Sequence, residues 1–329
     1  MFKQFVKKYN LPKYRTSQLY TQYYRNLIGS WDDLTTWSKD LREKLKKDIP
    51  FSKLIYISTN ISKDGNTQKV LFKTVKGNLI ESVLIKEKDR NTVCVSCMSG
   101  CPVGCIFCAT GQMGLNELLD SQQILDQILY FSRELKLKNE RVTNIVYMGM
   151  GEPMLNLKNV SLSIKDITDK EKMGFSKRRV TVSTSGYIQP LRQFLNMNLG
   201  VKIAISLHAP NQKLRDILMP TVSKSNSLKD LFNILDEYSN RKNKRITYEY
   251  VLLRGMNDSV ENAKELANLL KDRLALVNLI NYNEVDCLPF KKSKNTILFK
   301  KILEERGITC TIRKSLGEDI KGACGQLAS

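Results

Sequence analysis

Five of the eight cysteines occupy one stretch of fifteen residues, and their spacing could hold an iron–sulfur cluster. They are Cys94, Cys97, Cys101, Cys105 and Cys108, and the last three form the spacing C-x3-C-x2-C. Iron–sulfur cubes are usually held by four cysteine thiolates. Three thiolates leave one iron open, and an open iron can bind and break a substrate. The spacing therefore predicts a 4Fe-4S cluster with a catalytic use.

Other uses of these cysteines are less compatible with the sequence. Structural zinc takes four ligands, commonly paired cysteines or histidines. The single histidine, His208, is far away in sequence, and Cys287, Cys310 and Cys324 supply no second C-x2-C pair. A disulfide framework is disfavoured because the chain is long, lacks a secretory signal and is expected in the reducing cytosol. Zinc and unreactive core cysteines stay open as alternatives.

The residues around these cysteines favour a loop that wraps around a ligand. Gly100, Gly104, Gly111 and Gly114 lie close together, and Pro102 interrupts any regular helix. Backbone amides freed in this way can donate to cluster sulfurs or to an anion. An ordinary glycine-rich loop is the alternative, but it does not explain why the cysteines concentrate there.

The elements that must position this loop alternate between strands and helices from residue 92 onward. Apolar, β-branched runs predict strands at 92–96, 144–148, 179–184, 201–206, 246–252 and 276–280. Helical patterns follow at about 120–137, 157–168, 188–197, 226–240, 259–272 and 295–306. Six such units predict an α/β fold, a partial (βα)6 TIM-like barrel with its site at the carboxyl ends of the strands.

Polar or glycine-rich motifs follow four of these strands, at 149–153, 183–186, 206–210 and 281–283. Glu152 could accept from an ammonium group, and the hydroxyls at 183–185 suit a carboxylate or a ribose. His208 is also compatible with a hydrogen-bonded position in the core. Cys324 lies between Ala323 and Gly325, a setting that suits either a ligand contact or a buried thiol.

The first ninety residues have a different character. Residues 1–50 predict short helices beginning near 11–15, 32–34 and 38–41, with eleven Lys and Arg, five Asp and Glu, and several tyrosines. That mixture suits RNA contact, or equally a solvated cap with its tyrosines in a small core of its own. Strands at 54–58, 68–72 and 79–85 predict a short antiparallel β extension. We therefore expect a helical accessory RNA-binding domain at 1–50, a β extension and linker at 51–91, and a catalytic domain at 92–329.

The charge balance points to a polyanionic partner. Lys and Arg total 53 against 33 Asp and Glu, a formal net charge of +20, which favours nucleic acid. A lysine-rich proteome is the alternative. A membrane is disfavoured, because no apolar run approaches the roughly 18 residues that span a bilayer and no obvious basic helix has an aromatic face.

The motifs together resemble the RlmN/Cfr family of radical S-adenosylmethionine (SAM) RNA adenosine methylases, over essentially the whole chain. C-x3-C-x2-C with Phe107 before its last cysteine is the radical SAM signature. The remaining matches lie at 11–15, 94–96, 148–153, 182–186, 206–210 and 323–327.

This resemblance implies a role for each matching residue. Cys101, Cys105 and Cys108 would hold the 4Fe-4S cluster. Cys324 would be methylated and carry the methyl group, and Cys94 would resolve the RNA–protein adduct, leaving a Cys94–Cys324 disulfide. Glu81 would accept a proton, although it could equally be a solvent-facing glutamate on a strand. The positions implied to contact SAM are Gly151, Glu152, Ser183, Ser206, Leu207, His208 and Asn283.

The resemblance also implies an activity and partners. The family methylates adenosine with two SAM molecules per turnover, and its substrates are the peptidyl-transferase-centre adenosine of 23S rRNA and an adenosine beside certain tRNA anticodons. Glu152-Pro153 and residues 183–186 resemble the C2 branch, and the Cfr-like C8 branch, which gives antibiotic resistance, is the alternative. We expect a cytoplasmic monomer with an external electron donor such as flavodoxin or ferredoxin. A non-catalytic iron–sulfur RNA-binding assembly factor, or radical chemistry on a peptide or small molecule, would be a different class.

Three places depart from the family pattern. Cys97-Met98, Glu284 and Lys321-Gly322 stand where the family usually has Ser-Gln, Pro and Asp-Ala. None of them removes an implied catalytic residue, but Cys97 adds a thiol near the cluster loop.

Overall fold

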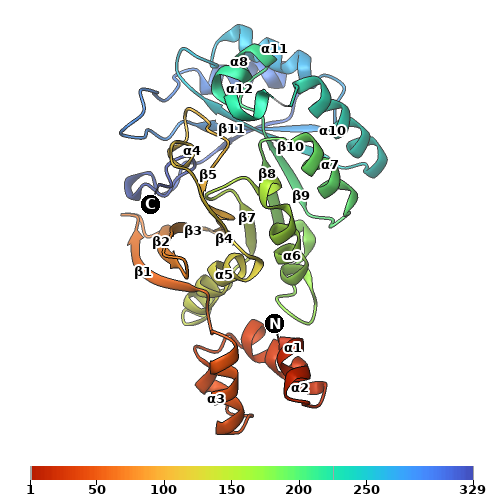
Figure 1. Ribbon diagram of the computed structural model, residues 1–329. Coiled ribbons are helices and arrows are strands. Elements are labelled where there is room, and N and C mark those ends of the chain that lie inside the picture. The colour runs from red at the N-terminus through yellow and green to blue at the C-terminus, as the bar shows by residue number, and fades with distance from the viewer. Residues whose placement is uncertain (1, 225, 329) are drawn as a thin grey trace.

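The computed structural model describes residues 2–224 and 226–328. Its centre is one curved sheet of ten strands in the order β1-β2-β3-β4-β7-β8-β9-β10-β11-β12. Figure 1 shows this sheet with the helices α1 to α3 gathered at one end of the molecule, away from helices α8, α11 and α12. The fold is the predicted partial barrel, because β1 and β12 are free edges and no strand pairing among the described residues closes the sheet.

Seven neighbouring strands of this sheet run parallel, one more than the sequence predicted. They are β4 Arg90–Cys94, β7 Asn144–Tyr147, β8 Val180–Thr184, β9 Lys202–Ser206, β10 Ile246–Leu252, β11 Ala275–Asn281 and β12 Cys310–Arg313. The missed strand, β12, is only four residues long and two of its residues are Thr311 and Arg313. A polar run this short carries little hydrophobic periodicity.

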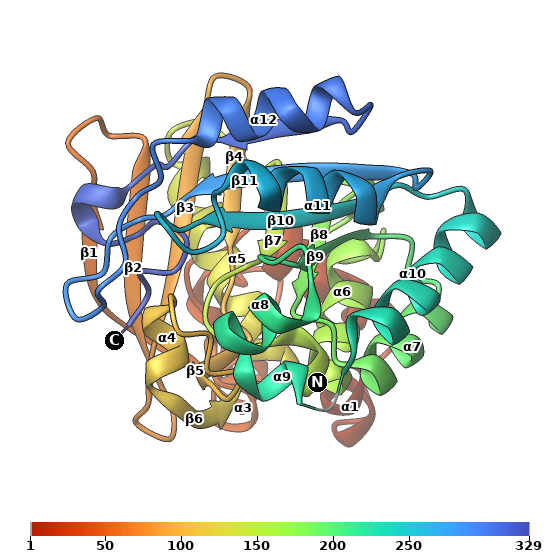
Figure 2. The same cartoon turned by 90° about the horizontal axis from the view of Figure 1, so that it is seen from above.

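Helices lie along the outside of the curved sheet, as the view from above shows (Figure 2). The six predicted helices are present as α5 Ser121–Lys136, α6 Leu157–Thr168, α7 Ile188–Asn196, α10 Leu228–Lys242, α11 Val260–Leu270 and α12 Thr296–Glu305. Asp120 caps α5 by accepting from two backbone N–H groups, and the helix buries Ile124, Ile128 and Phe131 against the sheet. Three short helices, α4 Ala109–Gln112, α8 Gln212–Leu218 and α9 Pro220–Ser223, were not predicted.

The three predicted antiparallel strands are present, but they do not form a separate small sheet. They are β1 Leu54–Ile61, β2 Thr67–Thr74 and β3 Leu79–Glu87. Strand β3 pairs antiparallel with β4, with Val83 opposite Cys94, and β4 then pairs parallel with β7. The β extension therefore continues the main sheet and places β3 directly beside the strand that carries Cys94.

The N-terminal residues form short helices around an aromatic core. The elements are α1 Phe2–Lys8, α2 Tyr14–Tyr20, a π-helical turn Thr21–Arg25, a 3-10 turn Trp31–Asp33 and α3 Lys39–Asp48. Tyr20, Tyr23 and Tyr24 are buried with Phe2 and Trp31, so these tyrosines belong to the region's own core. Helix α3 begins within the predicted range 38–41, with Ser38 as its cap, and the short helix predicted near 32–34 begins one residue earlier, at Trp31, because Ser30 caps it.

This helical region packs against α5. The Tyr23 hydroxyl lies 3.2 Å from Asp126 Oδ1, and Arg133 Nε donates to the carbonyl of Ile28 at 2.9 Å. The Arg133 guanidinium also lies 4.6 Å from the centre of the Phe51 ring. Buried hydrogen bonds and a cation–π contact thus fix the N-terminal helices to the main domain. No described helix is both long enough and apolar enough to cross a bilayer.

Candidate active site

The three cysteines of the C-x3-C-x2-C spacing line one wall of a cavity at the carboxyl ends of the strands. Their loop is closed by a two-stranded antiparallel ribbon, β5 Met98–Cys101 and β6 Gly114–Leu118, which the sequence did not predict. At Gly100, φ is +72° and an added Cβ would lie 2.0 Å from the carbonyl oxygen of Gly114. Glycine is therefore required where the ribbon closes.

The three thiols suit an iron–sulfur cube better than a single metal ion. Burial raises the pKa of Cys101 to about 12, and it also raises the pKa of Cys105 and Cys108. Metal binding must therefore displace protons from these thiols. No three Cys, His, Asp or Glu side chains in the described residues are grouped to hold one ion. A cube does not need such a group, because each thiolate binds a different iron.

Glu152 organises the loops beside the cysteines. Its Oε1 accepts from the Met154 N–H at 2.9 Å and the Thr184 hydroxyl at 2.5 Å. Its Oε2 accepts from the N–H and the hydroxyl of Ser185 at 2.7 and 2.8 Å. Burial raises the pKa of this carboxyl, while these donors lower it. The carboxylate joins the loops after β7 and β8, and an ammonium donor would have to share oxygens that already accept four bonds.

Arg215 in α8 has a comparable role, and the sequence analysis did not identify it. Its guanidinium is buried and donates to the carbonyls of Ser206 at 3.0 Å, Leu207 at 2.6 Å and Ser185. Burial lowers its pKa to about 10, so it stays charged at neutral pH. It holds the ends of β8 and β9 together. A single arginine on a short helix gave no motif from which this role could be predicted.

His208 is buried and hydrogen-bonded, as one interpretation of the sequence expected, and it also lines the cysteine cavity. Its Nδ1 accepts from the Val251 N–H at 3.0 Å, and its ring meets Phe107 edge to face. Burial lowers the pKa of His208 to about 3, which keeps the imidazole neutral. Ser183 and Ser206 line the same cavity, with their hydroxyl oxygens 3.3 Å apart. Leu207 is fully buried and does not line it.

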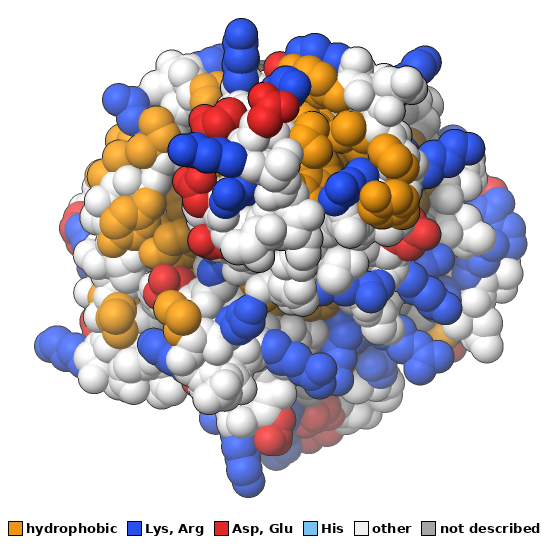
Figure 3. All heavy atoms as spheres, turned by 90° about the horizontal axis from the view of Figure 1, so that it is seen from below, with side chains coloured by type: hydrophobic (Ala, Val, Ile, Leu, Met, Phe, Trp, Pro, Cys, Tyr) orange, Lys and Arg blue, Asp and Glu red, His pale blue; other side chains and the backbone are white. Residues whose placement is uncertain are grey.

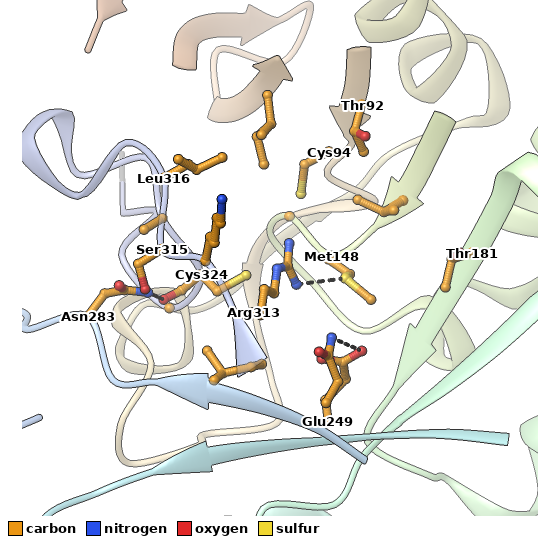
Figure 4. A pocket seen from close by; sticks show the side chains of 18 of the residues that line it. Thr92, Cys94, Met148, Thr181, Glu249, Asn283, Arg313, Ser315, Leu316 and Cys324 are labelled. Carbon is orange, nitrogen blue, oxygen red and sulfur yellow. Dashed lines mark hydrogen bonds between the residues drawn. The ribbon is translucent and has the colours of Figure 1, made fainter. Parts of the chain in front are cut away.

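A second cavity of about 610 Å³ adjoins the first. Cys94, at the end of β4, and Cys324, on the C-terminal segment, both line it, and Cys324 and Cys108 line both cavities. Figure 4 shows the Cys94 and Cys324 side chains directed into this space, with Arg313 between them. Both cysteines are free thiols here. The structure therefore brings together two residues that are 230 positions apart in the sequence.

The segment that carries Cys324 is held by several hydrogen bonds. Asn283 Nδ2 donates to the carbonyl of Cys324 at 3.0 Å, and its Oδ1 is buried with no hydrogen-bond partner in the described residues. The Ala109 N–H donates to the carbonyl of Gly325 at 2.8 Å, beside the cluster loop. An unsatisfied buried amide oxygen facing a cavity is typical of a ligand-binding position.

Glu81 is buried, so the alternative of a solvent-facing strand glutamate was wrong. Its Oε1 lies 2.8 Å from the ammonium of Lys69, and its Oε2 accepts from the Ala328 N–H at 2.9 Å. The carboxylate does not line either cavity. In this conformation Glu81 fixes the chain four residues beyond Cys324.

The inside of the barrel carries polar side chains beside aliphatic ones in the larger cavity. Strand residues that line the larger cavity include Thr92, Asn144, Thr181, Thr247, Asn278 and Thr311. In closed barrels these positions are dominated by bulky Val, Ile and Leu, which pack the interior. Here the interior stays open, and Glu249 projects into it with Asn278 Nδ2 donating to its carboxylate at 3.0 Å.

Comparison with known proteins agrees with this geometry. Residues 95–267 match the family model described as the radical SAM superfamily. A radical SAM methyltransferase of known structure from Sphaerobacter thermophilus superposes with a TM-score of 0.95 at 40% identity, covering 98% of this chain and 95% of that chain. Fold and site thus define a radical SAM enzyme, a class that binds SAM and a 4Fe-4S cluster.

Curated relatives identify the family within the radical SAM enzymes. Probable dual-specificity RNA methyltransferase RlmN from Dictyoglomus turgidum is 43% identical over 96% of this chain and 90% of its own length. Dual-specificity RNA methyltransferase RlmN from Campylobacter jejuni is 40% identical over 96% of this chain and 92% of its own. The chain belongs to the RlmN family of radical SAM RNA methyltransferases.

Proposed function

We propose that this enzyme methylates C2 of adenosine in the peptidyl transferase centre of 23S rRNA and in tRNA next to the anticodon. The observation that carries this proposal is the position of Cys324, which lines both the cysteine cavity and the larger cavity that contains Cys94. A methyl carrier must meet the SAM site on one side and the RNA base and the resolving thiol on the other. The relatives named as dual-specificity RNA methyltransferases support the two substrates.

The chemistry of adenine explains why these parts are needed. C2 lies between two ring nitrogens, is electron-poor and has no lone pair with which to attack the methyl group of SAM. When bound, the cluster at Cys101, Cys105 and Cys108 supplies the electron that cleaves SAM to a carbon radical. We assign Cys324 as the nucleophile that first accepts a methyl group, and Cys94 as the thiol that later attacks Cys324. One SAM molecule would donate the methyl group and a second would be cleaved to the radical, so each turnover would use two SAM molecules.

The SAM site is assigned to the strand-end residues. Gly151, Ser183, Ser206 and His208 line the cysteine cavity, and their donors and acceptors suit an amino acid and a ribose. Glu152 and Leu207 would act through the loops that they hold, by way of hydrogen bonds at the ends of β7, β8 and β9. Asn283 offers SAM or the base an amide oxygen that has no hydrogen-bond partner among residues 2–224 and 226–328.

Glu81 is proposed as the acceptor of the C2 proton. It lies on β3, beside the strand of Cys94, and its contact with Ala328 ties it to the segment of Cys324. Because the carboxylate lies outside both cavities in this conformation, acting on the base requires the C-terminal segment to shift.

The RNA is proposed to contact the basic N-terminal helices as well as the mouth of the cavities. Figure 3 shows more lysine and arginine side chains than acidic ones on the lower face of the molecule. Lys3, Lys7 and Lys13 are exposed and form no ion pair within the described residues, whereas Lys8, Lys44 and Lys46 are paired with carboxylates. Residues 1–50 would then be the accessory RNA-binding domain, 51–91 the β extension and 92–329 the catalytic domain.

The remaining assignments follow from the same chemistry. Reductive cleavage of SAM needs an external electron donor such as flavodoxin or ferredoxin. Because rRNA and tRNA are cytoplasmic, we expect the enzyme to act in the cytoplasm. We expect it to act there as a monomer. The C2 branch is preferred to C8 because Pro153 follows Glu152 and Ser185 precedes Gly186.

Nucleoside mass spectrometry of rRNA and tRNA from cells with and without the gene tests this proposal. We expect 2-methyladenosine in both RNAs only when the gene is present, and its loss in strains that carry Cys324→Ala or Cys94→Ala. Appearance of 8-methyladenosine instead would assign the enzyme to the C8 branch. Unchanged RNA, with the gene still needed for ribosome assembly, would replace catalysis by a binding role.

A further inference from the structure

We propose that Arg313 is a positioning residue of the cysteine pair, whose guanidinium stabilises Cys94 as a thiolate for the step that releases RNA from Cys324. This inference rests on the proposed function. It concerns a residue at the end of β12, the strand that the sequence analysis missed.

The position of Arg313 is fixed from two sides. It pairs with Ile280 in the register of β12 with β11, and its Nη1 donates to the Met148 sulfur at 3.4 Å, just after β7. Figure 4 shows the guanidinium between the side chains of Cys94 and Cys324. A thioether is a weak acceptor, and a guanidinium carries five N–H donors. Donors therefore remain for an anion in the cavity, which Arg313 lines.

The charged and titratable groups around Arg313 indicate that this anion is a cysteine thiolate. Cys324 and Arg313 are the groups that face Cys94, and the first disfavours its thiolate while the second favours it. Burial nevertheless raises the pKa of Cys94 to about 12. Arg313 faces Cys324, Glu249, Cys94 and, more weakly, Glu87, and its pKa lies above its ordinary value chiefly because of Cys324. Loss of Arg313 would remove the cation that favours the thiolate of this buried residue.

The release step needs a thiolate at Cys94. Its electron pair attacks the sulfur of Cys324 and forms the S–S bond, while the bond from that sulfur to the RNA methylene breaks. The electron pair of the broken bond stays with the carbon, which takes a proton and becomes the methyl group. Two cysteines are thereby oxidised and the carbon is reduced, so the step balances. A protonated Cys94 cannot begin it.

Two measurements on Arg313→Met, Arg313→Lys and Lys202→Met test the assignment. Lys202 lines the same cavity from the opposite, amino-terminal end of its strand, so its substitution is a matched loss of charge. The first measurement is the amount of denaturation-stable RNA–protein adduct after turnover with RNA and SAM. The second is the rate of Cys94 alkylation by iodoacetamide at pH 9, followed by peptide mass spectrometry in the Cys324→Ala background.

We expect Arg313→Met to accumulate adduct severalfold and to slow alkylation about tenfold, which corresponds to one pKa unit. Arg313→Lys should recover much of both effects, and Lys202→Met should leave the rate of Cys94 alkylation at that of the parent. Equal alkylation rates in Arg313→Met and the parent would overturn the assignment, even where adduct formation is lost. If the parent forms no methyladenosine, the proposed function fails, and the alkylation rates still judge the role of Arg313.

Discussion

Burial controls the charge of single side chains in this site. It raises the pKa of Cys94 and Cys101 to about 12, and lowers that of His208 to about 3. A low-dielectric surrounding disfavours the charged form of each group. The thiols thus stay largely protonated at neutral pH, even at Cys94 where Arg313 favours the thiolate, and the histidine stays neutral. His208 therefore serves as a hydrogen-bond acceptor and not as a cation.

The depressed pKa of His208 predicts a pH-dependent stability. Between its folded pKa of about 3 and an unfolded pKa of about 6.5, only the unfolded chain binds the proton. Stability is therefore full above this window and is lost as the pH falls through it, by about 1.4 kcal/mol per unit. We expect His208→Asn to remove this slope, because Asn can accept from the Val251 N–H and tolerates the positive φ of 56°.

Urea unfolding of the parent and His208→Asn proteins at several values between pH 4.5 and 7 measures the slope. The difference in unfolding free energy between the two proteins should change by about 1.4 kcal/mol per pH unit below about pH 6.5 and level off above it. Parallel curves for the two proteins would show that His208 is protonated in the folded state.

At the scale of elements, close contacts at glycine positions hold the loops at the ends of the strands together. Gly149 and Gly151, after β7, lie against the segment that leads into β5 and the cluster loop. At Gly151, φ is +100° and an added Cβ would lie 2.5 Å from Met98 Cβ. The SAM-proximal loop and the cluster loop are therefore packed as one unit.

Gly151→Ala should destabilise the enzyme more than a glycine substitution at another positive φ that causes no clash. Gly65 supplies the comparison, because its φ is +70° and nothing lies within 4 Å of an added Cβ. We expect Gly65→Ala to cost about 1 kcal/mol and Gly151→Ala about 2 to 4 kcal/mol. Thermal unfolding of both variants checks this ranking, and SAM affinity should fall only in Gly151→Ala. Equal losses in the two variants would mean that Met98 moves aside freely.

The sequence predicted elements well where periodicity was strong, and missed them where elements were short. Helix α6 was predicted at 157–168 and is Leu157–Thr168, because its apolar stripe spans three turns. The β5–β6 ribbon pairs two segments of four and five residues across the cluster loop. Its stability comes from that pairing and from packing, neither of which leaves a local pattern.

At the scale of the whole molecule, charge is expected to decide RNA binding. Each lysine that neutralises an RNA phosphate steepens the fall of log affinity with log salt by roughly 0.7 to 0.9. We expect the triple variant Lys3→Gln, Lys7→Gln, Lys13→Gln to make this slope shallower by about 2 and to weaken the binding of all RNAs alike. Methylation of Cys324 by SAM should be unaffected. Filter binding at several salt concentrations measures the slope.

Lys300 and Lys301 on α12 provide the control. They lie within four residues of Glu304 and Glu305, with which they pair, on a helix far from the N-terminal end of the molecule (Figure 1). Replacing both by Gln removes positive charge without touching the proposed RNA face. If each charge removed from α12 makes the salt slope shallower by as much as each charge removed from the N-terminal helices, RNA binding depends on overall charge alone.

From the sequence alone, the candidate cluster cysteines and the class of chemistry could be predicted. Three cysteines at C-x3-C-x2-C, the motifs at strand ends and a net charge of +20 are local or additive properties, so they can be found without coordinates. Only the tertiary structure decided which distant residues meet. Cys94, Arg313 and Cys324 come from β4, β12 and the C-terminal segment, and they face one cavity because the open sheet brings those elements together. Arg215 was missed, and the alternative of a solvent-facing Glu81 was wrong. Burial and hydrogen-bond partners are set by packing between segments far apart in the chain, so the sequence does not reveal them.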